Sequence, residues 1–239
     1  MWAQPPRQLL LEQGGLHIWQ ASLALSSREG GPLEGVLSAE ETDRCARFVR
    51  PSDQARCRAS RASLRLVLAR YLGRDPGELS IGAGTTGKPR LNGADASIQF
   101  NVSHAGDLVL IAVSRGLRVG IDVERIREVA DLDSILDGFF SAQEAAWVRS
   151  RERTGAFFLV WTRREAAAKA LGTGLFDCFA RFALPSAEHD GSGFKVELAD
   201  APADPARPWW IRDLLPAPGY AGAVCVETDN PAPMFWSLE

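Results

Sequence analysis

The sequence predicts an α+β fold of two similar, pseudo-symmetric lobes, each with a small, mostly antiparallel sheet packed against helices. One observation is a set of short segments in which apolar and polar residues alternate with the period of a strand. The other is a short internal sequence similarity. Ser38-Ala39-Glu40-Glu41 resembles Ser141-Ala142-Gln143-Glu144, and each precedes a longer helical segment rich in basic residues and alanine. We place the lobes at residues 1–126 and 127–239 and expect a ligand cleft between them.

The helices of the N-terminal lobe are marked by their ends. Ser38 and Glu41 have the spacing of a capping box, which predicts a helix that opens there and runs through Phe48. A second, longer helix is expected over residues 52–72, and Gly73 is suited to end it. Its leucines recur on one side, which we expect to face the core.

Strands are expected wherever the apolar and polar residues alternate. Their ranges are 15–23, 98–104, 108–114, 119–124, 209–212 and 221–227. The turn at residues 105–107 joins two of these strands directly. Further along the chain we expect a long helix that ends at Gly172, a turn over residues 187–193 and a loop over residues 200–208.

The composition is that of a globular protein, with 46% hydrophobic residues, 24% charged residues and a formal net charge of -3. This balance excludes the strongly basic class of nucleic-acid-binding proteins. No apolar run is long enough to span a membrane, and the first residues lack the features of a signal peptide. We therefore expect a cytoplasmic, monomeric enzyme without a nucleic-acid or membrane partner. Its four cysteines lack metal or C-x-x-C spacing and are expected to be reduced, mostly buried thiols.

Arginine is concentrated in one segment. The arginines of this segment are Arg44, Arg47, Arg50, Arg56, Arg58, Arg61, Arg65 and Arg70. The plain interpretation is a solvated helix face. The functional one is a local anion site, because the guanidinium fork matches phosphate oxygens.

Three acidic residues suggest a metal site. Asp122 and Glu124 lie two apart on an expected strand and therefore project from the same face. Glu165 lies on an expected helix, four residues before Lys169 and on the same helical face. Three carboxylates suit a hard cation such as Mg²⁺, which also binds phosphate, whereas a D-x-E pair alone is typical of a solvated edge.

The segment from Gly82 to Lys88 has the glycine and lysine spacing of a P-loop. The next residue is Pro89, so the hydroxyl that would hold Mg²⁺ is missing and a phosphate-binding helix is not expected to follow. We therefore reject a nucleotide-hydrolysing P-loop. Lys88 could still be a single phosphate contact.

Ser103 and His104 are adjacent on an expected strand. Their side chains would point to opposite faces, which disfavours a catalytic dyad, and the G-x-S-x-G pattern is absent. A structural hydrogen bond and a phosphate contact are both open interpretations of His104.

Several motifs together resemble the 4′-phosphopantetheinyl transferases, of the larger two-lobed type that activates peptide and polyketide synthetases. The resemblance extends from about residue 37 to residue 175. The motifs are Gly87-Lys88-Pro89, Phe100-Asn101-Val102-Ser103-His104, Gly120-Ile121-Asp122-Val123-Glu124, Phe139-Phe140-Ser141, Trp161-Thr162-Arg163-Arg164-Glu165 with Lys169, and Gly172-Thr173-Gly174-Leu175. One departure is Arg164, where the family usually has lysine.

The resemblance implies that coenzyme A binds between the lobes. It implies that Mg²⁺, or Mn²⁺ in its place, is held by Asp122, Glu124 and Glu165, and that Lys169 assists at the phosphates and orients Glu165. The residues implied to hold the phosphoadenylate part of coenzyme A are Arg61, Lys88, Ser103 and His104, with Arg44 and Arg47 as weaker candidates.

The implied reaction transfers 4′-phosphopantetheine from coenzyme A to a serine of an apo acyl- or peptidyl-carrier domain, and releases adenosine 3′,5′-bisphosphate. Glu165 is the leading general base, directly or through a water. Two alternatives are a metal-dependent phosphodiesterase that acts on a nucleotide pyrophosphate, and a non-catalytic module that binds coenzyme A or a partner.

Overall fold

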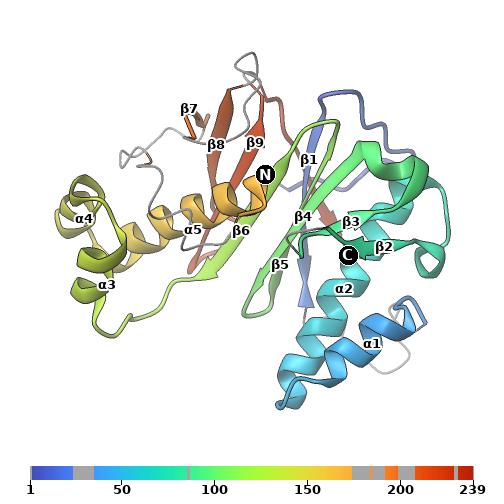
Figure 1. The fold of residues 1–239 in the computed structure, drawn as a ribbon, viewed down its shortest axis with the longest axis horizontal. Helices are drawn as coiled ribbons and strands as arrows, with labels where there is room; N and C mark the ends of the chain where they lie inside the picture. The colour runs from blue at the N-terminus through green and yellow to red at the C-terminus, as the bar shows by residue number, and fades with distance from the viewer. Residues whose placement is uncertain are drawn as a thin grey trace.

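The protein is described by a computed structural model. The described residues are 2–23, 35–84, 87–173, 184, 192–198, 208–228 and 231–238. Most of the expected turn at 187–193 and most of the expected loop at 200–208 lie outside these ranges, as do Gly174 and Leu175 of the last motif. The described part contains two four-stranded sheets, one two-stranded sheet and five α-helices, which confirms the α+β class (Figure 1).

The first sheet has the strand order β10-β1-β5-β4. Its strands are β1 Leu16–Ser22, β4 Ile98–Ala105, β5 Leu108–Arg115 and β10 Met234–Leu238. Three of these strands were expected and pair antiparallel, whereas the unexpected β10 pairs parallel with β1. The C-terminal strand thus completes the sheet that the N-terminal strand begins.

The second sheet has the order β6-β9-β8-β7 and is antiparallel throughout. Its strands are β6 Val119–Arg125, β7 Phe194–Val196, β8 Trp209–Leu214 and β9 Tyr220–Glu227. A separate hairpin joins β2 Ile81–Ala83 to β3 Pro89–Leu91. Pro89 therefore opens a strand and not a helix, in agreement with the rejection of a P-loop.

The helices are α1 Ala39–Ala46, α2 Pro51–Leu72, α3 Leu132–Phe139, α4 Ala142–Arg149 and α5 Arg153–Leu171, and two short 3₁₀ turns are η2 Pro76–Glu78 and η3 Gly93–Ser97. Both expected capping boxes are present, at the starts of α1 and α4. Helix α1 ends two residues earlier than expected. Gly73 ends α2 and Gly172 ends α5, each with a left-handed backbone.

The two sheets share a hydrophobic core. Strand β1 shows how this arises, because its side chains alternate between two faces. Trp19 packs with α2, while Ile18 joins a cluster that includes Ile121 and Val224 of the second sheet. The first sheet is therefore covered by α2 on one face and by the second sheet on the other.

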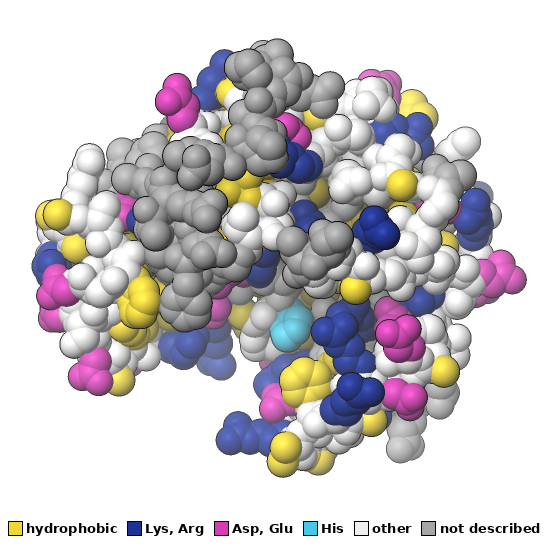
Figure 2. Space-filling view, viewed as in Figure 1, with side chains coloured by type: hydrophobic (Ala, Val, Ile, Leu, Met, Phe, Trp, Pro, Cys, Tyr) yellow, Lys and Arg dark blue, Asp and Glu magenta, His cyan; other side chains and the backbone are white. Residues whose placement is uncertain are grey.

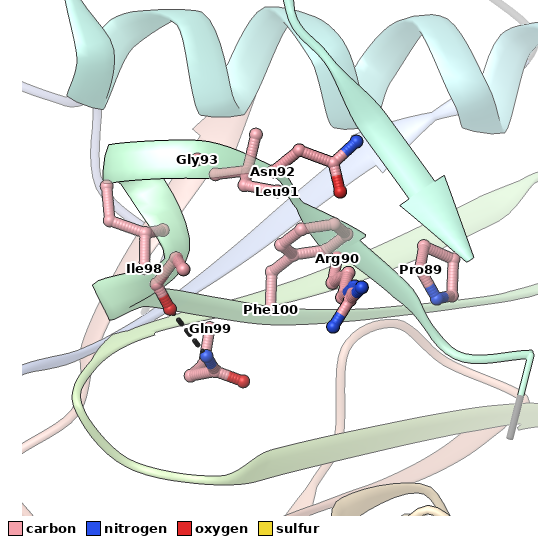
Figure 3. Close-up of a pocket in the computed structure, with 9 residues that line it drawn as sticks. Pro89, Arg90, Leu91, Asn92, Gly93, Ile98, Gln99 and Phe100 are labelled. Carbon is pink, nitrogen blue, oxygen red and sulfur yellow. Dashed lines mark hydrogen bonds between the residues drawn. The ribbon is translucent and has the colours of Figure 1, made fainter. Parts of the chain in front are cut away.

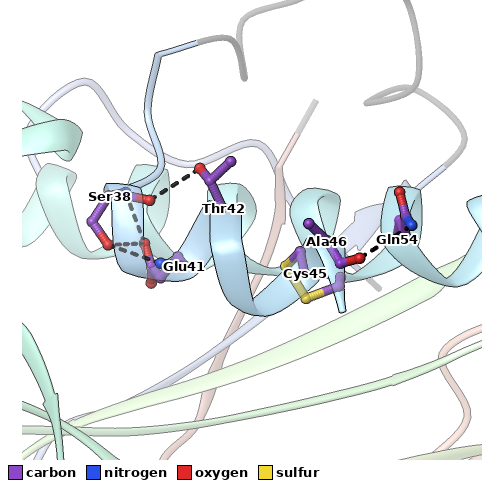
Figure 4. The surroundings of a disulfide bond; sticks show 7 residues. Ser38, Glu41, Thr42, Cys45, Ala46 and Gln54 are labelled. Atoms are coloured by element: carbon purple, nitrogen blue, oxygen red, sulfur yellow. Dashed lines mark hydrogen bonds between the residues drawn. A yellow bond between two sulfur atoms is a disulfide. The ribbon is translucent and has the colours of Figure 1, made fainter. Parts of the chain in front are cut away.

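The structure corrects the expectation that all cysteines are reduced. Cys45 and Cys57 form a disulfide, with their Cα atoms 5.5 Å apart (Figure 4). The tight turn between α1 and α2 brings the two thiols within disulfide range, and spacing in the sequence could not show this. Cys225 is a buried free thiol, as expected, and Cys178 lies outside the described residues.

Candidate active site

The site lies where the two sheets meet, along β4 and β6. Side chains of β4 bridge to β6 at this seam. Asn101 Oδ1 accepts a hydrogen bond from the backbone N–H of Ile121 at 2.8 Å, and Ser103 Oγ donates to Asp122 Oδ1 at 2.8 Å. These bonds hold Asp122 at the junction of the lobes, where it is only 3% exposed.

Gly120 allows α5 to lie directly on β6. A Cβ atom at this position would fall 2.1 Å from the carbonyl oxygen of Ala166 and 2.3 Å from the backbone nitrogen of Ala170. Such contacts are closer than atoms can approach, so only glycine permits this packing. The close approach places Glu165 and Lys169 beside the acids of β6.

Lys169 forms an ion pair with Asp122. Its Nζ lies 2.6 Å from Asp122 Oδ1 and also donates to Ser103 Oγ at 3.1 Å. The structure thus pairs Lys169 with the strand acid and not with Glu165, four residues earlier on its own helix. Asp122, Ser103 and Lys169 form a closed hydrogen-bonded triangle in this structure.

The three expected acids share one electrostatic environment. Burial raises the pKa of Glu124, and the charge of Asp122 raises it further, while Arg127 acts in the opposite direction. Burial also raises the pKa of Glu165, again with the charge of Asp122 adding to the effect, and Glu124 contributes less. These carboxylates therefore lie close enough to repel one another.

A metal ion would relieve that repulsion, and one atom is suited to receive it. Asp122 Oδ2 is buried and has no hydrogen-bond partner among the residues that the structure describes. An unpartnered buried carboxylate oxygen is costly unless a cation binds it. In that same part of the chain, no three acidic, histidine or cysteine side chains converge on one coordination point as they stand. The oxygen donors suit a hard cation.

Basic side chains border the acidic group. His104 lies on the opposite side of β4 from Ser103, as strand alternation requires, and is more exposed than Ser103. Partial burial lowers the pKa of His104, and so do the charges of Lys169, Arg56 and Arg61. Figure 2 shows Lys and Arg side chains gathered over α1 and α2, beside a hollow in which a histidine is visible. The site therefore has an acidic floor and a basic rim.

Arg61 belongs to this rim and is partly buried. Burial lowers its pKa, the charges of Arg44 and Arg65 lower it too, and Glu41 opposes them. Arg44 and Arg47 are exposed at the end of α1. The arginines that we expected to bind phosphate thus lie near one another on α1 and α2.

Lys88 points inward. Its Nζ donates to the carbonyl oxygens of Val119 at 2.6 Å and of Lys169 at 2.8 Å. Burial lowers the pKa of Lys88 to about 8. In this structure the ammonium group joins the start of β6 to the end of α5, so a phosphate contact by Lys88 stays a prediction.

Sequence reasoning missed several contributors. Asn101 and Gly120 stand inside quoted motifs, but their bridging and packing roles depend on contacts across the seam. Arg56, whose charge lowers the pKa of His104, was named only as a member of the arginine-rich segment. Arg164 is buried in an ion pair with Glu144, the capping-box acid of α4, and thus faces away from the site.

A separate cavity of about 380 Å³ lies in the first lobe, beside β3, η3 and β4 (Figure 3). Its lining residues are Pro89, Arg90, Leu91, Asn92, Gly93, Ala96, Ile98, Gln99 and Phe100. It contains none of the acids of the site.

The fold and site define a two-lobed α+β protein with an acidic seam and a basic rim. The sequence model of the 4′-phosphopantetheinyl transferase superfamily matches residues 118–225, and that of the N-terminal region of 4′-phosphopantetheinyl transferase matches residues 32–116. Together the two matches cover most of the chain.

Named relatives agree with these matches. The chain is 31% identical to 4′-phosphopantetheinyl transferase HetI of Nostoc sp. (strain PCC 7120) over 98% of its own length and 97% of the relative. It is 27% identical to 4′-phosphopantetheinyl transferase Sfp of Bacillus subtilis (strain 168), over 84% of this chain and 87% of that protein. The chain therefore belongs to the 4′-phosphopantetheinyl transferase superfamily and is an enzyme. Among the described residues, none of the helices is both long and apolar enough to cross a bilayer.

Proposed function

We propose that this site transfers 4′-phosphopantetheine from coenzyme A to a serine hydroxyl of an apo acyl- or peptidyl-carrier domain, with release of adenosine 3′,5′-bisphosphate. One observation carries the proposal. Asp122, buried at the seam with one unpartnered oxygen, lies within electrostatic reach of Glu124 and Glu165 and beside a basic rim. Bound cations and positive side chains are the groups that stabilise phosphoryl transfer in other enzymes.

Asp122, Glu124 and Glu165 would hold Mg²⁺, or Mn²⁺ in its place. The ion would neutralise charge on the diphosphate of coenzyme A, where the bond to be broken lies. Lys169 adds a fixed positive charge at this point, since its Nζ lies 2.6 Å from Asp122 Oδ1.

The serine hydroxyl must lose its proton when its oxygen attacks the phosphorus. Glu165 is the proposed acceptor of that proton, directly or through one water. A carboxylate bound to a metal ion is a weak base, which favours the route through one water. The bond from phosphorus to the bridging oxygen then breaks, and the nucleotide leaves.

The basic rim would position the leaving nucleotide. We assign its phosphates to Arg61 and His104, with Arg44 and Arg47 nearby on α1. Ser103 and Lys88 belong to the same proposed set, and both already bind at the seam, to Asp122 and to two backbone carbonyls respectively. Holding the donor in line with the attacking oxygen is a positioning effect.

We also propose that the enzyme acts as a monomer in the cytoplasm, where it would meet coenzyme A. The Cys45–Cys57 disulfide is the described feature that counts against this location, because disulfides are typical of oxidising compartments.

The test is incubation of the protein with coenzyme A, Mg²⁺ and several apo-carrier domains, followed by intact mass measurement. We expect each accepted carrier to gain the mass of one phosphopantetheine, and a carrier with serine replaced by alanine to gain none. Unmodified carriers after prolonged incubation would contradict the proposal. Consumption of coenzyme A without carrier modification would instead indicate phosphodiester hydrolysis.

A further inference from the structure

The turn between α1 and α2 presents an apolar pair to solvent. Phe48 is 48% exposed and Val49 is 96% exposed. Among the described residues they form the only adjacent pair of large exposed hydrophobic side chains. Val49 in particular contributes almost nothing to the core, so the pair offers an apolar contact to a partner.

Arginines surround this pair. Between residues 44 and 61 the chain carries six arginines and one aspartate, although its formal net charge is -3. Arg47 and Arg50 flank the apolar pair directly, and both are exposed. We call the surface formed by Phe48, Val49 and Arg50 the turn surface.

The turn is held in place by contacts on its inner side. The Cys45–Cys57 disulfide joins the end of α1 to the second turn of α2 (Figure 4). Gln54 Nε2 donates to the carbonyl oxygens of Ala46 at 3.3 Å and Phe48 at 2.8 Å. A fixed turn presents its exposed side chains without the entropic cost of ordering them on binding.

Helix α2 connects the turn surface to the basic rim of the site. Helix α2 runs from the turn to Arg56 and Arg61, whose charges lower the pKa of His104 on the rim. From Pro51 to Arg61 the helix rises by about 15 Å. A small domain of about 100 residues has a radius of gyration of about 13 Å, so one domain can cover the turn surface and reach the acids.

We propose that the turn surface docks the carrier domain, an acidic helical partner whose apolar patch covers Phe48 and Val49. This inference rests on the proposed function, because it names a surface for the acceptor of that reaction. Arginine around an apolar centre complements an acidic helix around an apolar patch. A second copy of this chain would bring like-charged turns together, and a nucleic acid would leave the apolar pair uncovered.

The experiment uses an apo-carrier domain with its acceptor serine changed to alanine, so that binding is measured without reaction. Val49→Glu and Arg50→Glu alter the turn surface. Leu215→Glu is the matched control for an exposed apolar residue, and Arg7→Glu is the control for an exposed arginine. Calorimetric titration gives Kd for the carrier and, separately, for coenzyme A.

We expect each turn variant to raise Kd for the carrier about tenfold or more, with Kd for coenzyme A and the melting temperature unchanged. The controls should bind the carrier as the parent does. Carrier affinity within about twofold of the parent in both turn variants, or an equal loss in the controls, overturns the inference. A change in oligomeric state, or in affinity for a duplex RNA, without a change in carrier affinity also overturns it.

The same experiment separates this inference from the proposed function. If the parent binds the alanine carrier and yet leaves the natural carrier unmodified, the docking surface stands and the transferase proposal fails. If the parent modifies natural carriers while the turn variants bind and modify them equally well, the transferase proposal stands and the docking surface is rejected.

Discussion

At the scale of single residues, Asp122 connects the two lobes to the chemistry. One of its oxygens is bound by Lys169 and Ser103, and the other is buried without a partner in the described structure. The first oxygen fixes the orientation of the side chain, and the second is left available. This division explains how a buried carboxylate can be both rigid and able to bind a cation.

We therefore expect Asp122→Asn to lower kcat for carrier modification by about 100-fold, because the amide keeps the shape but loses the charge. The fold should survive, since Lys169 is 29% exposed and its ammonium group can stay hydrated. Intact mass time courses and thermal unfolding check this. Asp137→Asn, an exposed acid on α3, is the control, and an unchanged kcat in Asp122→Asn would remove Asp122 from the mechanism.

His17 is a second residue whose environment sets a measurable property. It is 4% exposed, and its Nδ1 lies 2.8 Å from Tyr71 Oη, which accepts a hydrogen bond from Trp19 Nε1. Burial lowers the pKa of His17 from 6.5 to about 4. Between pH 6.5 and about pH 4, His17 is protonated in the unfolded chain and neutral in the folded protein, so falling pH favours unfolding.

The free energy of unfolding should therefore fall by about 2 kcal/mol between pH 7.5 and pH 5 on account of His17. Urea unfolding at the two pH values measures the change. In His17→Gln, which has no titrating group at this position, the fall should be smaller by that amount. An equal fall in both proteins would show that His17 is not kept neutral by burial.

At the scale of elements, the contact of α5 with β6 decides whether the acids meet. Gly120 removes the side chain that would separate them, and Lys88 bonds to carbonyls at the start of β6 and near the end of α5. Arg163 and Arg164 of α5 are buried, and they form ion pairs with Asp213 and Glu144. These contacts hold α5 against β6, and the packing of the helix places Glu165 at the seam.

Gly120→Ala should lower the free energy of unfolding by about 3 kcal/mol, because the added Cβ collides with the backbone of α5. Transfer activity should fall as well, since Glu165 and Lys169 move away from β6. Gly138→Ala is the matched control. A Cβ at Gly138 meets no atom within 4 Å, so this helical position should gain up to about 1 kcal/mol. Chemical denaturation of both variants measures the difference, and equal stabilities would contradict the packing argument.

At the scale of the whole molecule, the two sheets depend on strands from both ends of the chain. Strand β6 comes after β1, β4 and β5 of the first sheet in sequence, but it pairs with β9 of the second sheet. Strand β10, near the C-terminus, pairs with β1 of the first sheet. The proposed boundary at residues 126 and 127 lies just after β6. Each proposed lobe therefore contains one strand that belongs to the other lobe's sheet.

We expect fragments 1–126 and 127–239 to remain unfolded when produced separately, because each lacks a strand partner and half of the shared core. The intact chain should unfold in one cooperative transition. Circular dichroism and amide-proton NMR dispersion of the fragments, compared with the full chain, check this. Native-like dispersion in an isolated fragment would show that the lobes are independent domains.

Local structure and the identity of the candidate site residues follow from neighbouring residues in the sequence. Alternating segments and paired capping boxes marked most strands and helices, because these signals arise from neighbouring residues. The spacing of Asp122, Glu124, Glu165 and Lys169 indicated the acids and their helix, and the motifs indicated the family. These features depend only on residue type and separation along the chain.

Contacts between distant residues depend on how the elements pack. The return of β10 to β1, the Cys45–Cys57 disulfide and the pairing of Lys169 with Asp122 all join residues that are distant or unpatterned in sequence. The physical reason is that such contacts are selected by the packing of whole elements. Only a glycine at position 120 and a seam formed by two sheets bring α5 close enough to complete the site.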